Sequence, residues 1–241
     1  MRYVVICGGT GIDIRRLKRQ ILPSDHILCA DGGSVHARKM GIIPDAIIGD
    51  MDSIDTETSE WAEANRIPLR EYPAEKDMTD SELCLSEVPE REEILLVMPF
   101  CGRFDHVLSN VLNAAEYARG GREIRVTDGR TLIDILLGPG EVKIELESTR
   151  DILGAEKLLI SAIPVTGPAS NVRSDGLYYP IGGRTLHPGQ SLGVSNKPAD
   201  GASEIIVALD DGVLFVIIGP DDARSGATSD EGFFPVTSGD I

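Results

Sequence analysis

The fold of this chain is decided by the stretch Ile47-Ile48-Gly49-Asp50-Met51-Asp52-Ser53-Ile54. Its apolar start predicts a buried strand, and Gly49 then lets the backbone turn or lets a ligand approach closely. Asp50 and Asp52 follow where the strand ends, and residues two apart on an extended backbone point to the same side. Two carboxylates on one side repel each other unless a cation lies between them. Hard oxygen ligands in this place suit Mg²⁺, which also binds phosphate oxygens, so the stretch indicates a metal site.

The same stretch also fits a polar turn between a strand and a helix, without any function. In that interpretation Ser53 or Asp55 caps the helix that follows, because a short polar side chain accepts hydrogen bonds from the first N–H groups of a helix. The positions of the other polar turns in the chain distinguish the two interpretations.

Strand-like runs and helical stretches alternate through residues 1–129. Apolar runs that predict strands cover residues 3–7, 27–30, 46–48, 67–72, 93–100 and 123–127. Helical stretches are expected from Gly11 to about Ile21, before Gly41, over 55–65, after Thr79 and from Phe104 to Gly120. This alternation predicts an α/β domain with a Rossmann-like, mostly parallel sheet and helices on both faces.

Polar side chains follow several of the predicted strands, at the carboxyl ends where ligands gather in parallel sheets. They are Asp31, Asp50 with Asp52, Asp77 with Asp80, and Arg103 with Asp105. Some have a structural explanation, since Thr79 and Glu82 fit a capping box and Arg103 with Asp105 fits a solvated surface pair. Several such turns on one edge of one sheet would nevertheless form a site, in which Arg103 clamps phosphate oxygens through its planar guanidinium.

After about residue 129 the pattern changes to short strand-like runs separated by Gly, Pro, Asn and Asp. The runs cover residues 132–137, 142–146, 157–163, 191–195, 205–209 and 213–218. They predict a second, all-β domain over 130–223, a sandwich or a barrel, followed by a polar tail over 224–241. Tyr178 and Tyr179 offer aromatic faces to a polar heterocycle, and Ser195 with Asn196 offers hydrogen-bonding groups. Ordinary packing and an ordinary turn explain the same four side chains.

Charge and composition limit the partners of the chain. A formal net charge of −16 over 241 residues repels nucleic acids and anionic membrane surfaces, so an anionic substrate needs a metal ion or a local group of cations. The apolar runs are too short to span a membrane, and the N-terminus lacks a signal-peptide pattern. The four cysteines form no CxxC pair, and Cys7 and Cys29 are expected in the core. A cytoplasmic protein without nucleic-acid or membrane partners is therefore expected.

Taken together, the motifs resemble those of the thiamine pyrophosphokinase (thiamine diphosphokinase) family. In chain order they are Ala30-Asp31-Gly32-Gly33, Gly49-Asp50-Met51-Asp52-Ser53, Lys76-Asp77-Met78-Thr79-Asp80, Gly102-Arg103-Phe104-Asp105-His106, Gly176-Leu177-Tyr178 and Ser195-Asn196. Their order and spacing cover nearly the whole chain. Two positions depart from the family pattern, because Cys101 stands where a second glycine is usual and Tyr178-Tyr179 stands where a tryptophan is frequent.

The resemblance implies an α/β catalytic domain followed by a β-sandwich domain, assembled as a homodimer. It implies transfer of a pyrophosphoryl group from ATP to the hydroxyl of thiamine, with release of AMP and with Mg²⁺ on Asp50 and Asp52. The catalytic residues that it implies are Asp50, Asp52, Asp77, Asp80, Arg103 and Asp105. The implied nucleotide-binding residues are Asp31, Gly32, Gly33, Thr79 and Arg103. The implied thiamine-binding residues, at the subunit interface, are Asp80, Tyr178, Tyr179, Ser195 and Asn196.

Three points stay open at the level of the sequence. Asp80 and Asp105 are both candidates for the general base that accepts the hydroxyl proton. A pyrophosphokinase of the same fold that acts on another hydroxylated heterocycle, such as a pterin alcohol, is an alternative, and the β-domain pocket decides between them. A thiamine-binding protein without turnover is a third possibility, against which the retained acidic and arginine residues argue.

Overall fold

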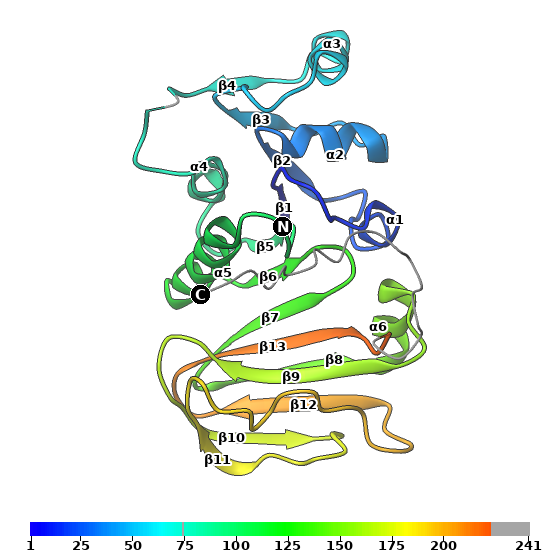
Figure 1. Cartoon of the computed structure of the whole chain (residues 1–241), viewed down its shortest axis with the longest axis vertical. Coiled ribbons are helices and arrows are strands. Elements are labelled where there is room, and N and C mark those ends of the chain that lie inside the picture. Colours follow the sequence, from blue (N-terminus) through cyan, green and yellow to red (C-terminus); the bar gives the residue numbers. More distant parts are fainter. Residues whose placement is uncertain (74, 223–241) are drawn as a thin grey trace, which may run out of the picture.

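The computed structural model describes residues 1–73 and 75–222 and contains two sheets, stacked along the long axis of the molecule (Figure 1). The first sheet has nine strands in the order β4-β3-β2-β1-β5-β6-β7-β13-β9, and the second has four in the order β11-β10-β12-β8. The tail predicted over 224–241 lies outside the described residues.

The parallel part of the first sheet comes from the first half of the chain. It consists of β1 (Arg2–Ile6), β2 (His26–Ala30), β3 (Ala46–Gly49), β4 (Leu69–Glu71), β5 (Glu93–Val97) and β6 (Ile124–Thr127). These six strands pair in parallel throughout. Their central members, β2, β1 and β5, consist mainly of buried apolar residues, as expected for strands that are covered on both faces. The predicted α/β fold with a mostly parallel sheet is confirmed.

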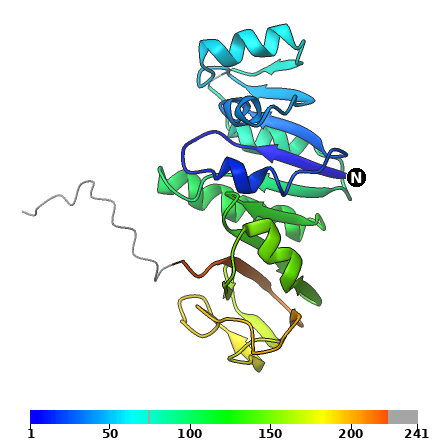
Figure 2. The ribbon, with the colours of Figure 1, turned by 90° about the vertical axis from the view of Figure 1, so that its right-hand side faces the viewer.

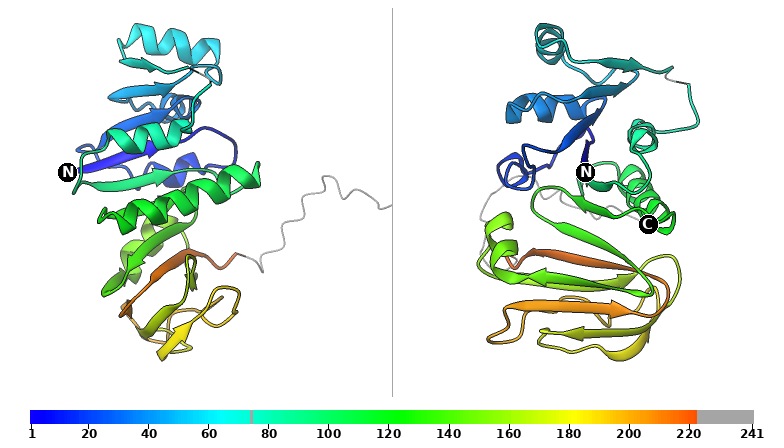
Figure 3. Two further views of the ribbon diagram at one scale, coloured as in Figure 1. Left: turned by 90° about the vertical axis from the view of Figure 1, so that its left-hand side faces the viewer. Right: turned by 180° about the vertical axis from the view of Figure 1, so that it is seen from behind.

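Helices cover both faces of this parallel part (Figure 3). One face carries α1 (Ile14–Leu17), α2 (Gly33–Met40) and α3 (Thr56–Ala64), and the other carries α4 (Asp80–Glu87) and α5 (Phe104–Arg119). The helix expected to reach about Ile21 ends at Leu17, because the N–H groups of Arg19 and Gln20 bond three residues back and tighten the last turn. Among the described helices, none is long and apolar enough to cross a membrane.

The second half of the chain forms a β-sandwich, seen edge-on at the lower end of Figure 2. Three antiparallel strands extend the first sheet, namely β7 (Leu132–Leu137), β13 (Val213–Pro220) and β9 (Leu158–Pro164). The second sheet consists of β8 (Gly140–Glu145), β10 (Ala169–Asp175), β11 (Gly182–Leu186) and β12 (Glu204–Leu209). A core that includes Leu158, Ile160, Ile205 and Val207 lies between the two layers. The predicted sandwich is confirmed, and the first sheet continues across the predicted domain boundary at residue 129.

One expectation for the second half was wrong, and three elements were not expected. The strand expected over 191–195 is a set of turns that ends at Ser195, whose φ of 57° interrupts an extended backbone. The helix α6 (Leu146–Leu153), with the Glu145 side chain accepting from the N–H groups of Glu147 and Ser148, was not expected. Strands β10 and β11 were not expected either, because their sequences are polar and only a few of their side chains are buried.

The four cysteines are free thiols, and three of them belong to the core. Cys7, Cys29 and Cys84 are buried, as the sequence predicted for the first two. Burial raises the pKa of Cys7 to about 12, so this thiol stays protonated and behaves as a small apolar side chain.

Candidate active site

The connections of two neighbouring strands, β1 and β5, leave the parallel sheet toward opposite faces. The turn after β1 leads to α1, and the turn after β5 leads to α5 on the other side. The crevice at such a switch point is the usual ligand site of an open parallel sheet. Here the two turns touch, because the Cys101 thiol donates to the Thr10 carbonyl over 3.3 Å and a Cβ on Gly9 would lie 3.0 Å from the Pro99 ring.

Three carboxylates meet beside this crevice, where β2 and β3 end. Asp31, Asp50 and Asp52 each offer an oxygen, and these oxygens all lie within 4.8 Å of one another. Asp31 is 5% exposed, and its Oδ2 accepts from the Ser53 N–H at 3.2 Å while its Oδ1 is buried without a hydrogen-bond partner. A buried, unpartnered carboxylate oxygen next to two more carboxylates fits a hard divalent cation, which takes oxygen ligands.

The sequence predicted Asp31 at this edge of the sheet but did not predict it among the metal ligands of this aspartate cluster. It was expected to contact the nucleotide, whereas the structure places it beside the two predicted metal ligands. Burial raises the pKa of Asp31, the nearby charges of Asp80 and Asp50 act in the same direction, and the hydrogen bond from Ser53 opposes them. The cluster therefore concentrates negative charge in a partly desolvated place, which favours occupation by a cation.

Gly49 brings a fourth carboxylate, that of Asp80, to the cluster. Its φ is 156°, and a Cβ at this position would lie 2.8 Å from the Asp31 Cβ and 3.2 Å from the Asp80 carboxyl carbon. Glycine is required here because any side chain would separate these two aspartates. The Lys76 ammonium lies 3.0 Å from Asp80 Oδ1, a contact to which the sequence assigned no function.

We expect Gly49→Ala to lower the free energy of unfolding by about 2–5 kcal/mol, since overpacking adds to backbone strain. Gly121→Ala is the matched control, because Gly121 has a φ of 87° but no heavy atom within 4 Å of the added Cβ. Urea unfolding of both variants, with Mn²⁺ titration of the folded proteins, checks the expectation. Equal destabilisation and equal Mn²⁺ affinity in the two variants would contradict a close approach of the aspartates at Gly49.

The start of α4 contains the predicted N-cap residue Thr79 next to the aspartate cluster. The predicted capping box is present, with the Thr79 hydroxyl accepting from the Glu82 N–H at 3.3 Å and the Glu82 carboxylate accepting from the Thr79 N–H at 2.7 Å. Asp55 likewise caps α3. The capping interactions therefore explain Thr79 and Asp55 without excluding a ligand near them, and Asp77 is exposed beside the same helix.

Arg103 and Asp105 bind each other at the start of α5. The guanidinium donates to the carboxylate over 2.6 and 3.3 Å, and both side chains are more than 60% exposed. The hydrogen bond to Asp105 and its charge raise the pKa of Arg103, and an exposed pair of this kind adds little stability. The pair instead holds an oriented, solvent-accessible guanidinium next to the switch point.

Tyr178 and Tyr179 form an aromatic platform between β10 and β11. The two rings pack edge to face with centroids 4.8 Å apart, and they are 46% and 64% exposed. The Lys197 ammonium lies 4.3 Å from the centre of the Tyr178 ring, a cation–π contact that the sequence did not predict. Exposed, paired aromatic rings beside a cation are suited to contact a flat heterocycle.

The Asn196 side chain binds the backbone of this aromatic platform. Its side-chain nitrogen donates to the Tyr179 carbonyl at 2.7 Å, and its oxygen accepts from the N–H groups of Tyr179 and Lys197 at 3.1 and 2.9 Å. The residue is 4% exposed. Its predicted contact with a heterocycle stays a prediction, because the amide here bonds the backbone of the platform. Ser195 is exposed, and its N–H donates to the Ser161 hydroxyl at 3.0 Å.

The aspartate cluster and the aromatic platform belong to opposite ends of the chain's fold. The cluster lies where β2 and β3 end, and the platform lies in the connection between β10 and β11. Figure 1 shows β3 near one end of the long axis and β10 with β11 at the other. The structure thus brings Asp31, Asp50, Asp52 and Asp80 together. The other predicted thiamine-contacting residues lie apart from them within one chain, namely Tyr178, Tyr179, Ser195 and Asn196.

Comparison with known families identifies both halves. Residues 17–126 match the family described as thiamin pyrophosphokinase, catalytic domain, and residues 141–214 match the thiamin pyrophosphokinase, vitamin B1 binding domain. The chain is 31% identical over 169 residues to thiamine pyrophosphokinase of Bacillus subtilis, covering 69% of this chain and 75% of that protein. The chain belongs to the thiamine pyrophosphokinase family. The resemblance seen in the sequence motifs is confirmed.

Other relatives agree with this membership. Thiamin pyrophosphokinase 1 of Caenorhabditis elegans is 25% identical over 181 residues, which cover 72% of this chain and 70% of that protein. The fold matches the crystal structure of the Bacillus subtilis enzyme with a TM-score of 0.77 at 24% identity, covering 92% of this chain and all of that one. The yeast thiamin pyrophosphokinase structure matches with a TM-score of 0.68 at 14% identity, covering 92% and 87%.

Proposed function

We propose that the protein transfers a pyrophosphoryl group from ATP to the hydroxyl of thiamine, producing thiamine diphosphate and AMP. The observation that carries the proposal is the convergence of Asp31, Asp50 and Asp52 at the ligand edge of a sheet in a member of this family. A vitamin B1 binding domain match in the same chain favours thiamine as the acceptor over a pterin alcohol.

Asp31, Asp50 and Asp52 would hold Mg²⁺, since their oxygens converge and one of them is buried without a partner. The ion would neutralise phosphate charge that an acidic protein otherwise repels. Asp80 lies beside this cluster and Asp105 beside Arg103, so each carboxylate is placed at one side of the site as a candidate acceptor for the hydroxyl proton.

Arg103 supplies the cationic group that the charge of the chain requires. Asp105 orients the guanidinium at the start of α5, and both groups are accessible to a ligand at the switch point. A planar guanidinium binds phosphate oxygens in pairs, and its charge persists at any physiological pH. The glycine-rich turn after β1, in contact with the β5 turn, lets a nucleotide approach the backbone closely.

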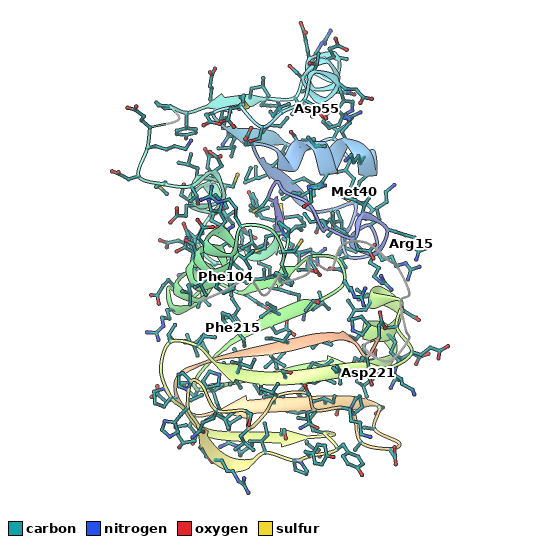
Figure 4. All side chains as sticks on the ribbon, viewed as in Figure 1. Arg15, Met40, Asp55, Phe104, Phe215 and Asp221 are labelled. Carbon is teal, nitrogen blue, oxygen red and sulfur yellow. The ribbon has the colours of Figure 1, made fainter. Side chains whose placement is uncertain are left out.

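The proposed active form is a homodimer whose sites combine residues of both subunits. Within one chain the aspartate cluster and the aromatic platform are separate, so thiamine contacts both only if a second copy supplies one of them. An apolar ridge on α5 offers a surface for such a copy, since Phe104, Leu108 and Leu112 recur every four residues and are 74%, 45% and 37% exposed. Figure 4 shows Phe104 at the start of this helix.

The four free thiols fit a reducing compartment, and we place the protein in the cytoplasm for this reason.

The deciding experiment is AMP formation from ATP with and without thiamine, in Mg²⁺ and after EDTA treatment. We expect thiamine-dependent AMP and thiamine diphosphate in equal amounts, and loss of the reaction in EDTA that excess Mg²⁺ restores. A panel with a pterin alcohol distinguishes another acceptor, and thiamine binding without AMP identifies a non-catalytic binder. ADP as the product, or full activity in EDTA, would refute the proposed reaction.

A further inference from the structure

Lys76 is a cation set against the edge of the aspartate cluster. Its ammonium lies 3.0 Å from Asp80 Oδ1 and donates to the Pro73 carbonyl at 3.2 Å, and its side chain is only 15% exposed. A lysine side chain that is withdrawn from water and fixed loses hydration and rotamer freedom. Such a loss is offset only by a strong favourable interaction, which here is the negative charge of the cluster.

The charge on Lys76 interacts with three carboxylates of the site, those of Asp80, Asp50 and Asp31. Burial acts to lower the pKa of Lys76, but the hydrogen bond with Asp80 and the charges of Asp80, Asp50 and Asp31 prevail and raise it. The ammonium therefore remains charged and neutralises part of a site that holds four carboxylates.

Structural roles do not account for this contact. Lys76 and Asp80 are four residues apart, but α4 begins only at Asp80, so they are not a pair on a helix surface. Thr79 and Glu82 already form the capping box of α4 without Lys76.

We infer that Lys76 is the internal counter-ion of the aspartate cluster, holding Asp80 in the free protein and moving to the triphosphate oxygens of ATP when nucleotide and metal enter together. The second half of this inference rests on the proposed function. The side chain has the flexibility for the transfer, since an ammonium on a four-carbon stem carries three rotatable donors and binds phosphate as a point charge. Lys76 thereby weakens the binding of a divalent cation alone and strengthens the binding of the cation together with ATP.

The first test measures Mn²⁺ binding to the nucleotide-free protein. The amount of free Mn²⁺ is determined from its electron paramagnetic resonance signal. Lys76→Met keeps the stem and removes the charge, and we expect it to bind Mn²⁺ about tenfold more tightly than the unchanged protein, from a unit charge a few ångströms away. Lys76→Arg should retain the weak binding. Lys143→Met is the control for net charge, because Lys143 is 61% exposed on β8 and pairs with Glu141.

The second test is binding of α,β-methylene-ATP in the presence of Mg²⁺. Here the effect of Lys76→Met on affinity should be opposite to its effect on Mn²⁺ binding. We expect Lys76→Met to weaken analogue binding about tenfold, because the triphosphate loses a cationic partner. Opposite effects on Mn²⁺ and on the analogue support the inference, whereas unchanged or weaker Mn²⁺ binding in Lys76→Met overturns it. The Mn²⁺ comparison requires no turnover, so it stays informative if the protein forms no AMP from ATP and thiamine and the proposed function fails.

Discussion

Asp50→Asn and Asp52→Asn are each expected to reduce thiamine-dependent AMP formation about a thousandfold, since loss of about 4 kcal/mol of charge stabilisation has this effect on a rate. Both side chains contribute oxygens to the aspartate cluster. An amide keeps the shape of the carboxylate but removes its charge and offers a single oxygen. The loss should appear in kcat as well as in the Mg²⁺ requirement, because the ligands act on the reacting phosphates.

The fold of these two variants should remain intact. Asp50 and Asp52 are partly or fully exposed, and removing one of several close negative charges lowers the repulsion within the metal-free cluster. Thermal unfolding in EDTA should therefore give a Tm equal to or above that of the unchanged protein. Asp151→Asn, at an exposed position on α6, is the control for the loss of one charge. Near-normal rates for both cluster variants would remove this pair from the metal site.

The first half of the chain was predictable because its signals are periodic and its geometry is regular. Each buried strand is an apolar run, and the carboxyl ends of parallel strands necessarily meet at one edge. For this reason the sequence alone predicted that Asp31, Asp50, Asp52 and Asp80 lie at one edge of the sheet. The close approach of Asp31 to the two predicted metal ligands depends on its φ of 42° and on the absence of a side chain at Gly49, and a pattern of polarity shows neither.

The second half was harder to predict because several of its strands are polar. In addition, its candidate site residues can serve either a ligand or the local backbone. Strands β10 and β11 expose most of their side chains, so they lack the alternation by which a half-buried strand is found. An Asn in a turn bonds either a ligand or its own backbone, and only coordinates showed that Asn196 bonds Tyr179. Its effect on thiamine binding is therefore expected to act through the position of Tyr179.

Activity is expected to return when two crippled variants share a dimer, if each site combines the aspartate cluster of one subunit with the aromatic platform of the other. One subunit carries Asp50→Asn, and its partner carries both Tyr178→Ala and Tyr179→Ala. The tyrosine rings are exposed while Asn196 holds the backbone beneath them, so their removal should leave the fold unchanged. Each ring contributes roughly 0.5–1.5 kcal/mol of stacking to an aromatic partner beyond its buried area.

The subunit composition of the mixed dimers determines how much activity should return. In a heterodimer one site receives both lesions and the other receives none, so a random mixture of subunits should recover about a quarter of full activity in a two-fold symmetric dimer. The matched control mixes Asp50→Asn with Asp52→Asn subunits. These two carboxylates belong to one cluster, so no arrangement of subunits rebuilds an intact site. Tandem affinity tags on the two subunits verify that heterodimers have formed. Recovery in the first mixture alone supports the shared site, whereas equal inactivity of both verified heterodimers places cluster and platform in separate sites and excludes the composite pocket.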